Sequence, residues 1–122
     1  MRRKIIEQFV EAINQQNVPQ LIEMMAEDFQ FIDTYGKSEN KEAMKSGWPG
    51  YFEWFPDYQI EIEEYLANES CAVLIGRASG SYLGQAEKQW ALPAAWKVVA
   101  ADQQIKIWQV FCDSKKQLDS MK

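Results

Sequence analysis

The spacing of apolar residues changes from helical to alternating near Pro56, and this change limits the folds open to the chain. Residues 3–15 and the segment from Pro19 to Asp28 carry apolar side chains three and four positions apart, as amphipathic helices do. After Pro56 the chain reads as four strands joined by polar turns, at residues 58–65, 71–79, 90–101 and 105–113. Helices followed by antiparallel strands predict an α+β fold, with the helices on one face of a curved sheet.

The length and the charge of the chain exclude several classes of function. Its 122 residues suit a single domain that spans 1–122. The net charge is -5, and basic residues cluster only at Arg2–Lys4, so the basic surface that nucleic acids require is absent. No apolar run approaches the roughly 20 residues that cross a membrane, and the N-terminus lacks the apolar segment of a secretory signal. We therefore expect a cytoplasmic protein that binds neither nucleic acid nor membrane.

The chain has no histidine, which removes many catalytic arrangements. Serine–histidine and cysteine–histidine nucleophiles are excluded, as are histidine-based metal sites. Any proton transfer must use Asp, Glu, Tyr, Cys or Lys. The two cysteines, Cys71 and Cys112, are far apart, and we expect both to be buried, reduced thiols. No metal or organic cofactor is implied.

The segment DFQFIDTYG predicts one further strand, and it places a carboxylate in an aromatic row. Strand side chains alternate between two faces, so Phe29, Phe31, Asp33 and Tyr35 share one face. Asp33 either lies past the buried part of the strand and stabilises the turn that ends at Gly36, or it points into an apolar cavity. In the second case it is a candidate general base.

The residues after Asn40 predict a third helix that ends early. Gly47, Pro49 and Gly50 are expected to break it. Aromatic residues crowd this break, and we assign three of them to a candidate site: Trp48, Tyr51 and Phe52. A broken helix packed with rings would form the wall or lid of an apolar ligand site. The alternative is that these rings belong to the core.

Four segments, in this order, resemble the SnoaL-like branch of the NTF2-like superfamily: FVEAINQQNVPQLIEMMAEDFQFIDTYG, KEAMKSGWPGYFEWFPDYQIEIEEYL, LPAAWKVV and IKIWQVFCD. This superfamily includes ketosteroid isomerases, limonene epoxide hydrolases and polyketide cyclases. The resemblance implies a cone-shaped α+β barrel with a deep apolar pocket, commonly as a homodimer formed through the outer face of the sheet. Fold alone does not decide function, because the superfamily contains enzymes and non-enzymes.

Residue by residue, the resemblance to the enzymes is incomplete. Asp33 falls at the catalytic base of the ketosteroid isomerases, but Phe9 stands where their tyrosine stabilises the oxyanion. Residues 90–99 also lack the acid that serves as their second donor. The epoxide hydrolases use an arginine and an acid on one strand and a second acid on the last strand. This chain keeps the arginine as Arg77, but Ser79 replaces the first acid, and the matching position of the last strand carries no acid. Without those donors and acids, neither reaction is predicted.

The strand at 71–79 is apolar on both faces, so its orientation must be assumed. We expect the face with Arg77 and Ser79 to look inward, where Arg77 needs an anion as its partner. That anion is either Asp33 or a ligand carboxylate or enolate; alternatively, Arg77 points to water. The opposite face would be apolar and would suit a dimer, with Ala72, Leu74, Gly76 and Ala78.

Two functions follow from these residues and stay open. The first is an enzyme acting on a small, mostly apolar carbonyl or cyclic compound, in which Asp33 moves a proton. Arg77, helped by Tyr51 or Ser79, would hold the oxygen that becomes negative. The second is a non-catalytic ligand-binding or dimerisation module with the same pocket. In both, the residues expected to contact the ligand are Tyr35, Trp48, Tyr51, Phe52, Ser79, Trp96 and Trp108.

Overall fold

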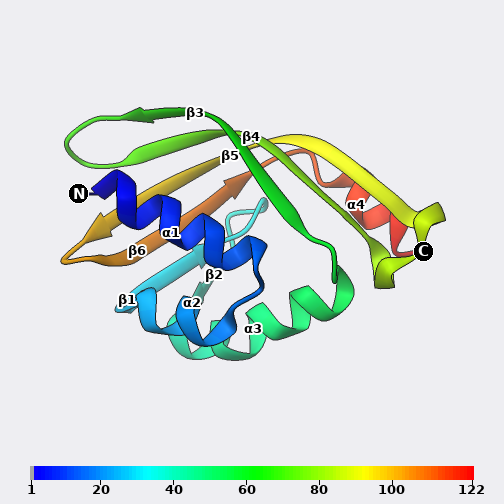
Figure 1. Ribbon diagram of the computed structural model, residues 1–122, viewed down its shortest axis with the longest axis horizontal. Helices are drawn as coiled ribbons and strands as arrows, with labels where there is room; N and C mark the ends of the chain where they lie inside the picture. The colour runs from blue at the N-terminus through cyan, green and yellow to red at the C-terminus, as the bar shows by residue number, and fades with distance from the viewer. Residues whose placement is uncertain (1) are drawn as a thin grey trace.

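Six strands form one sheet, and the helices lie against it (Figure 1). A computed structural model describes residues 2–122. The helices are α1 (Arg2–Asn14), α2 (Val18–Met24), α3 (Lys41–Trp54) and α4 (Lys115–Ser120), with short turns of 3₁₀-helix at Tyr82–Gly84 and Ala86–Lys88. The strands are β1 (Met25–Ile32), β2 (Ser38–Asn40), β3 (Gln59–Ala67), β4 (Ala72–Ser81), β5 (Gln89–Ala101) and β6 (Gln104–Phe111).

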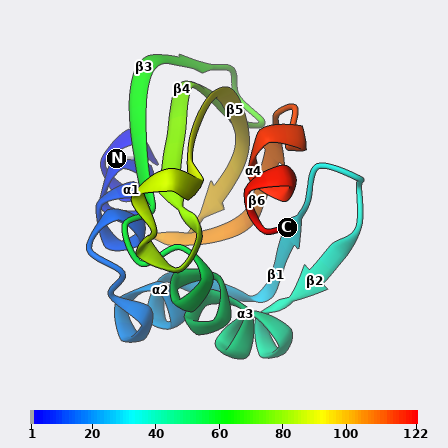
Figure 2. The same ribbon diagram turned by 90° about the vertical axis from the view of Figure 1, so that its right-hand side faces the viewer.

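The sheet is mixed and strongly bent. Its strand order is β2-β1-β6-β5-β4-β3, and every neighbouring pair is antiparallel except β1 and β6. Figure 2 shows the sheet bending from β3 round to β2, with α3 beneath it and α1 within the curve. The predicted α+β fold is confirmed, and the sheet curls around the helices without closing into a barrel.

The first helix fills part of the concave side of the sheet. Its buried face consists of Ile6, Phe9, Ala12 and Ile13, and it contacts β3, β5 and β6. The ring of Phe9 lies 5.1 Å from that of Trp108 and 6.0 Å from that of Trp48, measured between centroids. This aromatic packing joins α1, α3 and β6 into one core.

The predicted orientation of β4 is wrong. Ala72, Leu74, Gly76 and Ala78 face the core, whereas Arg77 is exposed on the outer side together with Val73, Ile75 and Ser79. A shift of one residue moves every side chain of a strand to the other face, and a strand that is apolar on both faces does not reveal which face is inside. Gly76 fits this inner position because a Cβ atom there would lie 1.9 Å from the carbonyl oxygen of Glu61.

Three helix predictions also need correction. The helix α3 continues through Pro49, because Trp48 and Phe52 are buried in the core and their packing outweighs the hydrogen bond that proline cannot donate. The second helix ends at Met24, earlier than predicted, and the polar tail forms α4. Among residues 2–122, no helix is both long enough and apolar enough to cross a membrane.

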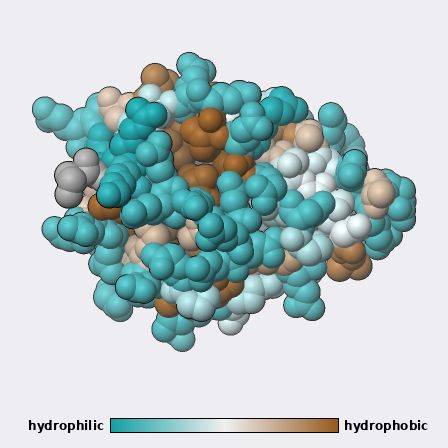
Figure 3. Space-filling view, in the orientation of Figure 1, coloured by the Kyte–Doolittle hydropathy of each residue, from teal (hydrophilic) through white to brown (hydrophobic). Residues whose placement is uncertain are grey.

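In the orientation of Figure 1, most of the visible surface is hydrophilic (Figure 3). Apolar side chains show mainly in the region between α1 and β3. A shallow groove lies there, with Ile6, Val10, Ile62 and Leu74 among its lining residues. Its edge is charged, since Arg3, Glu63 and Glu64 also line it.

Candidate functional site

A cavity of about 340 Å³ lies between the concave face of the sheet, α3 and α4. Its volume falls in the range of roughly 300–1,000 Å³ that is usual for small-molecule sites. The lining side chains are mostly apolar, and the aromatic ones are Phe31, Tyr35, Trp48, Tyr51, Trp54, Tyr58, Trp90, Trp96 and Trp108. The inner faces of β4 and β5 add small side chains, among them Ala78 and Ala94. These small residues leave the space that larger ones would fill.

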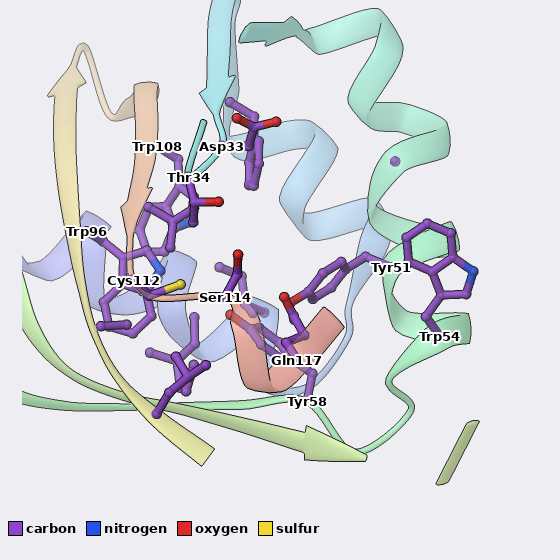
Figure 4. Close-up of a pocket in the computed structure, with 18 of the residues that line it drawn as sticks. Asp33, Thr34, Tyr51, Trp54, Tyr58, Trp96, Trp108, Cys112, Ser114 and Gln117 are labelled. Atoms are coloured by element: carbon purple, nitrogen blue, oxygen red, sulfur yellow. The ribbon is translucent and has the colours of Figure 1, made fainter. Parts of the chain in front are cut away.

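One wall of the cavity is formed by Trp96 on β5 and Trp108 on β6. Val98, two residues after Trp96 and on the same face, pairs with Trp108 across the two strands. The two indole rings are 6.3 Å apart at an angle of 32°. Figure 4 shows them side by side next to Cys112, with their nitrogen atoms turned towards the cavity.

The opposite wall carries two phenols, Tyr51 from α3 and Tyr58 from the segment before β3. Gln117 of α4 donates a hydrogen bond from Nε2 to the hydroxyl of Tyr51 (Figure 4). Burial raises the pKa of Tyr51, although the hydrogen bonds that Gln117 and Tyr58 offer to its oxygen partly oppose this. Burial also raises the pKa of Tyr58, and the nearby Tyr51 adds to the effect. Both phenols are therefore uncharged at neutral pH.

Asp33 lies at the edge of the cavity and not on its floor (Figure 4). The strand β1 ends at Ile32, so Asp33 begins the turn. Its Oδ1 atom accepts hydrogen bonds from the backbone N–H groups of Tyr35 and Lys37, both at 2.9 Å. The turn role that the sequence left open is therefore present, and it fixes the orientation of the carboxylate beside the cavity.

Among residues 2–122, the charged groups that line the cavity are carboxylates at its edge. Besides Asp33, Glu39 of β2 lines it, and Glu39 forms an ion pair with Lys37 at 3.5 Å. Within residues 2–122, no lysine or arginine lines this cavity. The same part of the chain holds no group of three or more Cys, Asp or Glu side chains arranged to hold a metal ion.

The structure separates the residues that we assigned to one site. Asp33, Tyr35, Trp48, Tyr51, Trp96 and Trp108 all line the cavity. Arg77 and Ser79 lie in an open groove on the outer side of the sheet, so their expected inward orientation is wrong and the alternative that Arg77 points to water is confirmed. Phe52 is buried and stacks on Trp48 behind the cavity wall, with ring centroids 5.9 Å apart.

Other lining residues were not identified from the sequence: Thr34, Tyr58, Trp90, Cys112, Ser114, Gln117 and Leu118. For Tyr58 and Trp90 a signal existed, because inward side chains alternate from Tyr58 into β3 and from Trp90 along β5. For Gln117 and Leu118 there was none, since α4 is short and has no buried residue. Cys71 and Cys112 are each half-buried, so the expectation of two fully buried thiols is also wrong. Burial is enough to raise the pKa of Cys112.

Comparison with known proteins identifies the family to which this fold belongs. The profile described as the SnoaL-like domain matches residues 6–110. No curated protein matches the chain in sequence.

Several solved structures are similar along nearly the whole chain. A candidate polyketide cyclase from Xanthomonas campestris pv. campestris has a TM-score of 0.84 at 15% identity, covering 98% of this chain and 96% of that one. A candidate hydroxylase from Streptomyces galilaeus has a TM-score of 0.79 at 16% identity, with 97% and 92% covered. A protein with a ketosteroid isomerase-like fold from Catenulispora acidiphila, solved with trimethylamine, has a TM-score of 0.77 at 16% identity, with 88% and 83% covered. At these identities the likeness shows the fold alone.

The buried phenols predict how stability depends on alkaline pH. A tyrosine with an ordinary environment loses its proton near pH ~10. Because folding raises the pKa of Tyr51, the unfolded chain binds fewer protons than the native state above about pH 10. The stability from this group is therefore complete below about pH 10 and is lost as the pH rises further. The free energy of unfolding of Tyr51→Phe should therefore fall less steeply between about pH 10 and about pH 12 than that of the unmodified protein. Urea unfolding at a series of pH values measures both slopes.

Tyr35→Phe is the matched control, because it removes a phenol that is 76% exposed. It should keep the alkaline slope of the unmodified protein. If Tyr51→Phe keeps it as well, the assignment of Tyr51 as a buried, protonated phenol is wrong.

Proposed function

Because the chain belongs to the SnoaL-like family, we propose that its cavity binds a small, mostly apolar carbonyl or cyclic compound. The observation that carries the proposal is the combination of a preformed aromatic cavity with uncharged polar groups inside and carboxylates only at the edge. Apolar walls supply affinity through burial, and a few polar groups fix the orientation of a ligand. A structural neighbour described as a candidate polyketide cyclase guides the choice of a cyclic carbonyl compound as the test ligand.

We further propose that Asp33 acts as a general base on that ligand. Its Oδ1 is held by two backbone N–H groups, and within residues 2–122 no hydrogen bond engages Oδ2. A fixed carboxylate beside an apolar cavity is placed to remove a proton from the carbon next to a carbonyl group. Arg77 has no part in this proposal, since it lies outside the cavity.

The second candidate function is a non-catalytic ligand-binding module. It is favoured by the two hydrogen bonds that Asp33 makes to the turn, which give this residue a purely structural use. It is also favoured by Phe9, which the resemblance puts roughly where ketosteroid isomerases have their oxyanion-binding tyrosine and which cannot donate a hydrogen bond.

We also propose a homodimer formed through the outer face of the sheet. The outer side chains of paired strands there include Ile75, Ala95 and Phe111 in one row, since Ile75 pairs with Ala95 and Ala95 pairs with Phe111. Leu66 and Val73 form a second apolar pair beside this row. Leu66 and Phe111 are each about half exposed, which is unusual for large apolar side chains unless a partner covers them. A twofold dimer would bring one copy of this surface against the other.

Filling the cavity should abolish ligand binding. Ala94 is buried and lines the cavity, so Ala94→Leu places three extra carbon atoms into the space that the ligand needs. With α-tetralone as the probe, we expect saturable binding to the unmodified protein and at least a tenfold weaker affinity for the variant, by NMR titration. Ala91→Leu, on the exposed face of the same strand, is the control and should bind normally. Equal binding by both variants would place the ligand elsewhere.

If Asp33 is a base, the protein should exchange the hydrogens next to the carbonyl group of α-tetralone with deuterium from D₂O. Asp33→Asn keeps an oxygen acceptor for the turn but loses basicity, so exchange should fall by roughly 10²-fold or more while binding persists. Proton NMR follows the exchange. The control is Asp28→Asn, which changes an exposed acid on β1 and should catalyse the exchange of the α-tetralone hydrogens at the rate of the unmodified protein. Identical exchange by Asp33→Asn and the unmodified protein would leave the non-catalytic module as the function.

A charge on the outer face of the sheet should separate the dimer. Phe111→Lys places an ammonium group in the proposed interface, where its desolvation has no compensation, so we expect a monomer. Leu83→Lys changes an equally exposed apolar residue in the turn after β4 and should leave the dimer intact. Sedimentation velocity distinguishes the two species. A monomer for the unmodified protein at micromolar concentration would refute the proposed interface.

A further inference from the structure

Two indole groups present hydrogen-bond donors to the same part of the cavity. Trp96 and Trp108 are 1% and 2% exposed, and their rings pack against each other on the wall formed by β5 and β6. Figure 4 shows both nitrogen atoms on the side of the cavity, with Thr34 and Cys112 drawn beside them. The two donors therefore face the same space.

Neither nitrogen has a hydrogen-bond partner within residues 2–122. Of the two other indoles in the interior, one is paired and one is not. The Nε1 atom of Trp48 donates to the sulfur of Met25 at 3.5 Å, and that of Trp90 is enclosed by the protein without a partner. An indole N–H can only donate, and buried donors in proteins are almost always paired. The open donors of Trp96 and Trp108 thus call for an acceptor that occupies the cavity.

The surroundings determine which kind of acceptor fits. No lysine or arginine within residues 2–122 lines the cavity, so an anionic ligand would lose its hydration without gaining a counter-charge. The acids at the edge, Asp33 and Glu39, would repel such a ligand as well. On the opposite wall, the oxygen of Tyr51 already accepts a hydrogen bond from Gln117. An uncharged oxygen, as in a ketone, needs no counter-charge and can accept from both indoles.

We infer that Trp96 and Trp108 form a two-donor site for the carbonyl oxygen of an uncharged ligand, and this inference rests on the proposed function of the cavity. Removal of a proton by Asp33 breaks the C–H bond next to the carbonyl. Its electron pair then forms the C=C bond of an enolate, while the carbonyl π pair moves to the oxygen and the proton stays on Asp33. Two fixed N–H groups stabilise the charge that gathers on this oxygen. They supply the donors that Phe9 cannot provide.

Indole N–H resonances test the inference directly. The protein contains five tryptophans, so ¹⁵N labelling of tryptophan gives a spectrum that Trp96→Phe and Trp108→Phe assign by loss of one signal each. Three probes of similar shape are compared: α-tetralone, tetralin, which lacks the oxygen, and naphthoate, which carries a carboxylate. Saturation with α-tetralone should move the indole proton signals of Trp96 and Trp108 downfield, whereas tetralin should bind without this shift. Naphthoate should bind at least tenfold more weakly than α-tetralone.

The affinities of the variants give a second measurement. Each phenylalanine keeps an aromatic ring in the wall and removes one neutral donor, so the affinity for α-tetralone should fall roughly three- to tenfold. The affinity for tetralin should stay the same, and this internal comparison separates loss of the donor from damage to the cavity.

The possible outcomes separate the inference from the proposed function. If α-tetralone and tetralin both bind but produce the same indole shifts, the cavity is a ligand site and the two-donor inference is overturned. If the variants bind α-tetralone as tightly as the unmodified protein, the inference is overturned in the same way. If neither compound binds, the proposed function fails and the inference fails with it. Downfield shifts of other indoles, with Trp96 and Trp108 unmoved, would also overturn it.

Discussion

The packing of Phe9 against Trp48 and Trp108 decides where the interior of this protein is filled and where it is open. The helix α1 has 13 residues and is therefore about 20 Å long, whereas β5, also of 13 residues, extends over about 43 Å. One helix cannot cover the whole concave side of such a sheet. Beyond the ring of Phe9 the small residues Ala78 and Ala94 face inward, and the cavity occupies the part of the curve that no helix fills.

The polar groups of this cavity differ from those of a site for charged ligands. Burial keeps the phenols of Tyr51 and Tyr58 protonated, and the indoles of Trp96 and Trp108 carry no charge at any pH. The interior therefore offers hydrogen bonds in a medium of low dielectric without a net positive charge. Such an environment favours a ligand that is itself neutral. Charge that develops during a reaction would meet donors that are already oriented.

The layers of the fold were predictable from the sequence, because each layer buries one face. The apolar spacing of α1 places Ile6, Phe9 and Ile13 in the core, as found. The orientation of β4 was not predictable, since both of its faces are apolar. For the same reason Arg77 was placed inside. The predicted break at Pro49 was wrong for another reason. Proline usually interrupts a helix, but the packing of the residues around Pro49 keeps α3 continuous. The helix α4 has no buried face, so nothing in its sequence marked it as part of the cavity.

The position of α4 matters for anything attached to the protein. This helix lies against the cavity, where Gln117 donates a hydrogen bond to Tyr51. After the helix, the backbone oxygen of Lys122 accepts a hydrogen bond from the Nζ atom of Lys88 at 3.2 Å. The first and last described residues lie at opposite ends of the molecule (Figure 1). A purification tag or a dye attached after Lys122 would thus lie beside the edge of the cavity, because Lys122 lines one groove together with Thr34 and Tyr35, which also line the cavity. The same addition before Arg2 would leave that edge clear, which makes the N-terminal side the better anchor for immobilising the protein on a sensor surface.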